Sequence, residues 1–302
     1  MSSGEYKLTV FHEVYTPQSL SKIDERAKHD KGLQSLNWIL KGDNDYPQIN
    51  RTHLDKCFCF AKEKGGLDND KISRLSNPND FHGWLSVYNE LLVPYFFAKV
   101  FKHKIEFVTN PAKKGLGDFH IIHPKGKVVV EVKTPKPKGD DAFSNGQKNA
   151  EYSGYGDEFI KSVLKEAFDQ LRPGTRNLVI ICPQLCRWIR IPKPFIWYLY
   201  GKEAMIDEEG RLRTAIVPNG ELLKHRPPRF TRISAVGSFW IDSIQYPNRK
   251  GLPVSLTLFH NYYAKKQIPI DVFDSVEQYV INESANHIAP INSGNCRFLI
   301  HE

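Results

Sequence analysis

Three ionisable residues, Asp118, Glu131 and Lys133, lie on a stretch of sequence that could bring them together. Residues 127–133 read Lys-Val-Val-Val-Glu-Val-Lys, an apolar run typical of a buried β-strand. Because side chains alternate along a strand, Glu131 and Lys133 share one face. A Pro-Lys-Gly turn just before the strand should return the Asp118 segment alongside it. A buried charged pair is costly unless another charge compensates it. We therefore expect the three groups to converge where a cation could bind.

These three residues would suit metal-assisted chemistry. Carboxylates of Asp118 and Glu131 and the main-chain carbonyl of Val132 are hard oxygen ligands, the type that Mg²⁺ or Mn²⁺ prefers. Lys133 could orient an attacking water and lower its pKa, or stabilise negative charge on a reacting phosphorus. The alternative is a set of cross-strand salt bridges on an ordinary sheet, with no chemistry attached.

The elements that would position this group are predicted on both sides of it. Upstream, residues 81–101 read as a mostly buried helix with Asp80 as its N-cap and Glu90 as its only carboxylate. A lone Glu in such a segment calls for a partner, although a partly exposed Glu on a rim remains the alternative. Downstream, residues 158–171 carry an apolar stripe at helical spacing.

A buried strand follows that second helix, over residues 177–182. A strand, a helix and a strand in this order predict a right-handed parallel crossover. Residues 82–183 thus read as a helix, two or three strands, a helix and a strand. Strand patterns recur beyond residue 200, at 230–240 and 254–260, and we expect them to extend the same sheet.

Over residues 82–183 this pattern resembles the PD-(D/E)xK phosphodiesterase superfamily, the restriction-endonuclease-like nucleases. Asp118 matches the first acid of the motif, Glu131 the second and Lys133 the lysine. Gly117 stands where the family pattern has proline. The resemblance implies an α/β fold with a restriction-endonuclease-like core, in which helices flank a central mixed β-sheet.

The resemblance also implies an activity: Mg²⁺-dependent hydrolysis of phosphodiester bonds in DNA, as in restriction, defence or repair enzymes, leaving 5′-phosphate ends. Mn²⁺ would substitute for Mg²⁺. Glu90 would complete the metal site with Asp118, Glu131 and Val132. Gln170 occupies a place where family members often carry an active-site polar residue, the alternative being a solvated Gln near a helix end. Two other functions stay open: a non-catalytic nucleic-acid-binding or regulatory protein that keeps the fold, and an RNA-directed nuclease.

The charge of the chain favours a polyanionic partner. The 302 residues carry a formal net charge of +8. Nine lysines between residues 102 and 138 face three acids, two of which are the proposed metal ligands. Basic surface around a carboxylate site suits nucleic acid, and we expect double-stranded DNA. The residues that we expect to contact it are Lys113, Lys114, Lys136, Lys138, Arg187 and Arg190.

Composition and domain organisation complete the prediction. No apolar run approaches the roughly 20 residues that cross a bilayer, and the N-terminus lacks a signal-peptide pattern. We therefore expect a cytoplasmic protein that does not enter a membrane. Its five cysteines are taken as unpaired thiols. A homodimer would suit cleavage of both strands. We divide the chain into a mostly helical N-terminal extension (1–80), the nuclease core (81–275) and a C-terminal tail packed on the core (276–302).

Overall fold

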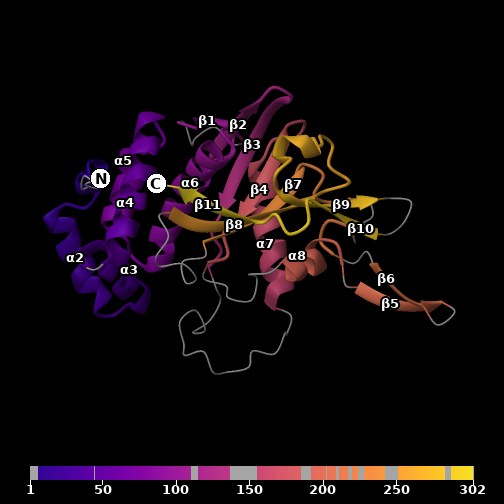
Figure 1. The fold of residues 1–302 in the computed structure, drawn as a ribbon, viewed down its shortest axis with the longest axis horizontal. Coiled ribbons are helices and arrows are strands. Elements are labelled where there is room, and N and C mark those ends of the chain that lie inside the picture. The colour runs from indigo at the N-terminus through magenta and orange to yellow at the C-terminus, as the bar shows by residue number, and fades with distance from the viewer. Residues whose placement is uncertain are drawn as a thin grey trace, which may run out of the picture.

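A nine-stranded mixed β-sheet forms the centre of the molecule (Figure 1). The computed structural model describes residues 6–43, 45–109, 115–136, 155–184, 192–201, 203–208, 211–216, 220–223, 228–241, 251–282 and 287–301. Eight strands follow one another across the sheet in the order β1-β2-β3-β4-β7-β8-β9-β10, and β11 pairs with β8 beside this path. The strands are β1 (Lys104–Phe107), β2 (Phe119–His123), β3 (Gly126–Lys133), β4 (Arg176–Ile181), β7 (Ala235–Ile241), β8 (Gly251–His260), β9 (Glu277–Asn282), β10 (His287–Ile291) and β11 (Arg297–His301).

Parallel and antiparallel pairing alternate in blocks along the sheet. Strands β1, β2 and β3 form an antiparallel meander, and β3 then pairs parallel with β4. Strand β4 pairs parallel with β7, β7 antiparallel with β8, and β8 parallel with β9. The parallel β3–β4 step is made by helix α7, which confirms the predicted crossover of strand, helix and strand. A separate hairpin of β5 (Glu203–Glu208) and β6 (Arg211–Ile216) stands apart from this sheet.

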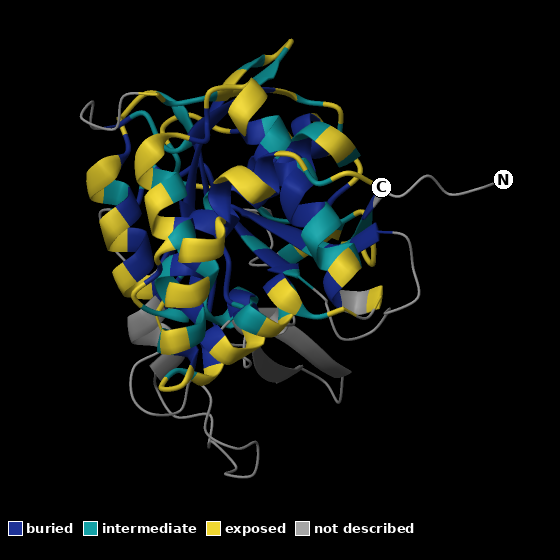
Figure 2. Cartoon of the chain, turned by 90° about the vertical axis from the view of Figure 1, so that its left-hand side faces the viewer, coloured by how far each residue is buried: buried dark blue, intermediate teal, exposed yellow. Residues whose placement is uncertain are grey.

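Helices cover both faces of the sheet. Before the first strand come α1 (Val10–Val14), α2 (Pro17–Ala27), α3 (Lys31–Lys41), α4 (Asp45–Glu63), α5 (Asn69–Ser76) and α6 (Phe81–Val100). Their buried side chains form one hydrophobic cluster with residues such as Val130, Val132 and Ile180. Helices α7 (Tyr155–Gln170) and α8 (Pro192–Leu199) pack on the opposite face, where Val129 and Val179 point. Figure 2 shows the buried sheet between exposed helical surfaces.

Local sequence signals explain where these helices lie. Asp80 accepts a hydrogen bond from the Gly83 N–H, so it caps α6 as predicted. The apolar stripe of α7 is buried at Ile160, Leu164 and Ala167, which confirms the helical periodicity. Helix α7 nevertheless begins at Tyr155, three residues before the predicted start.

The regions on either side of the predicted core are continuous with it. Helices α1–α5 confirm the predicted helical character of the N-terminal extension, and their core merges with that of α6. Strands β7 and β8 confirm that the C-terminal part extends the same sheet. The residues assigned to a tail (276–302) supply β9, β10 and β11 of that sheet. In the part of the chain that is described, no helix is both long and apolar enough to cross a bilayer.

Candidate active site

The site forms where β3 runs on past the end of β2. Strands β2 and β3 pair from His123–Gly126 to Phe119–Val130, and Asp118 follows directly, its N–H bonded to the Val130 carbonyl at 2.8 Å. Asp118 Oδ2 accepts the N–H of Val132 at 2.7 Å. The Asp118 carboxylate therefore takes the place of a strand partner beside the Glu131–Val132 peptide. Because the N–H and C=O of one strand residue point to the same side, the Val132 carbonyl also faces toward Asp118.

Glycine at position 117 makes this approach sterically feasible. Gly117 has φ +65°, a conformation that proline cannot adopt and that other L-residues rarely adopt. A Cβ atom there would lie 2.5 Å from the Val130 carbonyl oxygen. The departure from the proline of the family pattern is thus required by the local backbone, and it keeps Asp118 in register beside β3.

Lys133 is held by three acceptors. Its Nζ lies 2.9 Å from Glu131 Oε1, and it donates to Glu166 Oε1 at 2.7 Å and to Gln170 Oε1 at 2.5 Å. An ammonium group has three N–H donors, so all of them are engaged. The side chains of Lys133 and Glu131 are only 13% and 10% exposed, whereas that of Glu166 is 59% exposed. The buried pair is therefore anchored by two residues on the outer part of α7.

Electrostatics show an excess of carboxylate at this point. Burial raises the pKa of Asp118 well above its usual value, and the charges of Glu131 and Glu90 raise it further, against the Val132 hydrogen bond and Lys133. Burial also raises the pKa of Glu90. The charges of Lys71 and Arg74 act in the opposite direction, and Glu131 adds a smaller increase. For Lys133, burial favours the neutral amine, but Glu131 and Glu166 outweigh it and raise the pKa.

A divalent cation fits this imbalance of charge. Within the described ranges, Lys133 is the only cation in ion-pair contact with Asp118, Glu131 or Glu90. No group of three or more His, Cys, Asp or Glu side chains among those residues is arranged to enclose a metal ion. Mg²⁺ commonly takes one or two carboxylates and keeps several waters. Asp118, Glu131 and the Val132 carbonyl are oxygen ligands of this type.

The other predicted site residues lie at several places. Glu90 is partly exposed on α6. Its charge raises the pKa of Asp118, and the charge of Glu131 raises the pKa of Glu90. Gln170 is exposed at the end of α7 but reaches Lys133. Lys136 forms an ion pair with Asp80 at 2.9 Å. The remaining predicted nucleic-acid contacts lie outside the described residues: Lys113, Lys114, Lys138, Arg187 and Arg190.

Sequence reasoning missed two groups of residues beside the site. Glu166 precedes Gln170 by four residues, the spacing that puts both on one helix face, and this could have identified it. Asn89, fully buried next to Glu90, donates to Thr134 Oγ1 at 2.9 Å and pairs with the amide of Gln184. These hydrogen bonds connect the ends of β3 and β4 to α6, and no local sequence pattern predicts them.

Comparison with known proteins adds no relative: none of the family models, curated proteins or solved structures compared with the chain matches it. The functional argument therefore rests on the residues themselves.

Proposed function

We propose that this protein is a Mg²⁺-dependent nuclease of the restriction-endonuclease-like type, which hydrolyses phosphodiester bonds in DNA. One observation carries the proposal. The Asp118 carboxylate accepts a hydrogen bond from the Val132 N–H, next to Glu131, and Lys133 lies on the same face of β3 as Glu131. An aspartate, a Glu-x-Lys strand and the cross-strand contact between them are the arrangement that the motif predicts.

The order of elements supports the same proposal. Helix α6, the antiparallel meander β1-β2-β3, helix α7 and the parallel strand β4 follow one another in the sequence. The resembled family builds its core in this order. Glu131 and Lys133 lie at the end of β3, and Asp118 lies beside them on the edge of β3 that pairs with β2, which supports the proposal.

Each residue then has a defined task. Asp118 and Glu131 would hold the cation with the Val132 carbonyl, and Glu90 would add negative charge to its outer shell. When bound, Mg²⁺ would neutralise charge on the scissile phosphate and supply an acidified water. Lys133 would donate a hydrogen bond to the attacking water or to a non-bridging phosphate oxygen.

Access of substrate to Lys133 requires that it give up an acceptor. Since its three N–H groups are all engaged, a substrate oxygen must replace one partner. The Glu166 side chain is 59% exposed, against 10% for Glu131, so its contact with Lys133 costs less to break than that of Glu131. We assign Glu166 and Gln170 the role of holding Lys133 in place until substrate arrives.

The substrate follows from charge and chemistry. A net charge of +8 and a lysine-rich segment around the site favour a phosphate backbone. We propose double-stranded DNA, contacted by Lys136 among others, and a cytoplasmic protein that pairs with a second copy when both strands are cut.

A cleavage panel tests the proposal. Wild-type protein and Asp118→Ala, Glu131→Ala and Lys133→Ala variants are incubated with plasmid, methylated plasmid, single-stranded DNA and RNA, with Mg²⁺, Mn²⁺ or EDTA. We expect the wild type to cut DNA only with a divalent cation and each variant to be inactive while still folded by circular dichroism. Cleavage of RNA alone would redirect the proposal to RNA. Binding of DNA without cleavage by any cation would leave the non-catalytic alternative.

A further inference from the structure

A hollow distinct from the carboxylate site lies between the N-terminal segment, α4, the end of α6 and β11. Its volume is about 730 Å³, within the range of small-molecule sites. Three aromatic rings and three lysines line it: Tyr6, Phe60, Tyr95, Lys56, Lys99 and Lys102. Lys99 lies nine residues after Glu90 on α6, so about 14 Å of helix separates the two sites.

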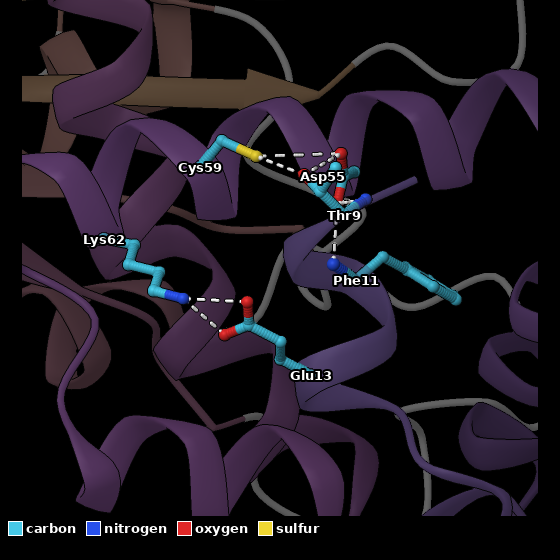
Figure 3. A network of polar contacts seen from close by, with 6 residues as sticks. All are labelled: Thr9, Phe11, Glu13, Asp55, Cys59 and Lys62. Atoms are coloured by element: carbon cyan, nitrogen blue, oxygen red, sulfur yellow. Dashed lines mark hydrogen bonds and ion pairs between the residues drawn. The ribbon is translucent and has the colours of Figure 1, made fainter. Parts of the chain in front are cut away.

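The wall at Tyr6 is fixed by a buried carboxylate. Asp55, which is fully buried on α4, accepts the Tyr6 hydroxyl at 2.9 Å, the Thr9 N–H at 3.0 Å and the Phe11 N–H at 2.6 Å. Figure 3 shows Asp55 at the centre of the contacts with Thr9, Phe11 and Cys59. These bonds hold the N-terminal segment against α4, so the Tyr6 ring, 42% exposed, keeps its position at the hollow.

The lysines carry charge that no described acid neutralises. Among the described residues, Lys56, Lys99 and Lys102 form no ion pair, and the lining Glu63 pairs with Lys64 instead. Lys56 lies over the Tyr6 ring at 5.0 Å and Lys99 over the Tyr95 ring at 5.6 Å. Each ammonium therefore lies beside an aromatic ring, and of these two rings only that of Tyr6 is exposed.

Lys102 is held in a conformation that lysine rarely adopts. Its φ is +57°, and only Asn292 shares such a value among the described non-glycine residues. It follows Phe101, the C-cap of α6, at the position where helices usually place glycine. This left-handed φ is a common way for a helix to end, and the Lys102 side chain lines the hollow.

From these observations we infer that the hollow binds a nucleotide unit. The base stacks on the exposed Tyr6 ring while the phosphate is held by Lys99 and Lys102. Tyr95 lines the hollow but is only 3% exposed, so it takes no part in stacking. Base–aromatic stacking with a lysine-held backbone is how single-stranded nucleic acid is bound without sequence preference. The unit is either one residue of an unpaired strand or a mononucleotide. This site is separate from the carboxylate site and requires no cleavage.

The test uses the cation-free Asp118→Asn protein, so that cleavage plays no part. The probes are 2-aminopurine 5′-monophosphate and a short single-stranded oligonucleotide containing 2-aminopurine, whose fluorescence falls on stacking. We expect saturable quenching, and at least fivefold weaker binding in Lys99→Gln and Lys102→Gly. Tighter binding of the oligonucleotide identifies a strand site, and equal binding identifies a mononucleotide site.

Two controls separate binding from folding. Lys28→Gln removes an exposed lysine on the helical region outside the hollow, and it should bind as the parent does. Lys102→Gly should not lower the melting temperature, because glycine adopts this φ without strain. Loss of binding together with unchanged melting thus supports the inference.

Three results would overturn it: no quenching with either probe, an equal loss in Lys28→Gln, or displacement by pyrophosphate as effective as by the nucleotide, which would mean that only an anion binds. Probe binding and DNA cleavage are measured separately. A protein that binds the probe but does not cut DNA supports this inference and not the nuclease proposal, and a protein that cuts DNA but does not bind the probe does the reverse.

Discussion

Excess negative charge around Asp118 predicts that the protein is stabilised by a divalent cation and by neutralising that residue. The perturbation is Asp118→Asn, which keeps an oxygen that can accept the Val132 N–H and removes the charge. Without cation, the variant should melt at or above the temperature of the wild type. With Mg²⁺, the wild type should gain stability and the variant should not.

The pH dependence has a definite sign. The folded-state pKa of Asp118 is raised by burial and by its acidic neighbours. Its contribution to stability is therefore fully present below the unfolded pKa of about 4 and is lost as pH rises through the raised pKa. In EDTA, the melting temperature of Asp118→Asn relative to the wild type should thus increase from pH 4 to pH 8.

The expected shift can be estimated. For 302 residues, the unfolding entropy is about 0.6 kcal/mol/K, so 1 kcal/mol shifts the melting temperature by about 1.6 °C. A ligand at 100 times its dissociation constant stabilises by about 2.7 kcal/mol. Saturating Mg²⁺ should therefore raise the melting temperature of the wild type by about 4 °C.

Differential scanning fluorimetry in EDTA and in a Mg²⁺ series measures both effects. Asp169→Asn is the matched control, since Asp169 is an exposed acid on α7, and it should respond to Mg²⁺ as the wild type does. An equal Mg²⁺ shift in the wild type and in Asp118→Asn, or a shift in neither, would refute the reasoning.

The other predictions concern Lys133 and the N-terminal segment. Lys133→Met leaves the nearly buried Glu131 without its ion-pair partner. We therefore expect the free energy of unfolding to fall by about 3 kcal/mol, which lowers the melting temperature by about 5 °C, and we expect no cleavage. An unchanged melting temperature would contradict this prediction. Glu166→Gln removes an acid that raises the pKa of Lys133, so the alkaline limb of the cleavage–pH profile should move to lower pH, with melting changed by less than about 1 °C; an unmoved limb would count against the assigned role. Asp55→Ala removes the acceptor of the Tyr6 hydroxyl and of the Thr9 and Phe11 N–H groups, and should cost about 3 kcal/mol in urea unfolding. Glu13→Gln, which breaks an exposed ion pair, should stay within about 1 kcal/mol of the parent.

Features set by local pattern could be predicted from the sequence. The apolar run of β3, the stripe of α7 and the N-cap at Asp80 depend on residues close together in the chain, and all three are confirmed. The return of Asp118 beside β3 followed from the turn before Gly126, and the β2–β3 pairing confirms it. Strands β7 and β8 were also recognisable from their composition, whereas β9, β10 and β11 were not.

Contacts set by tertiary placement could not be predicted. The spacing of Glu166 and Gln170 puts both on one helix face, but Glu166 meets Lys133 only because α7 crosses the face of β3, 33 residues away in the chain. Asp55 gains its partners from residues 44 to 49 positions earlier, through packing of the N-terminal segment on α4. The pairing of β11 with β8 likewise depends on long-range order. Polar residues of this kind carry no periodicity, so only the folded arrangement identifies their partners.

The measurement that addresses the central claim most directly is the single-turnover cleavage of an end-labelled DNA duplex, comparing the wild type with Asp118→Asn in Mg²⁺. Our account predicts cleavage by the wild type with 5′-phosphate and 3′-hydroxyl ends, none in EDTA, and none by the variant. Cleavage at the same rate by both proteins, or products ending in 3′-phosphate, would contradict it.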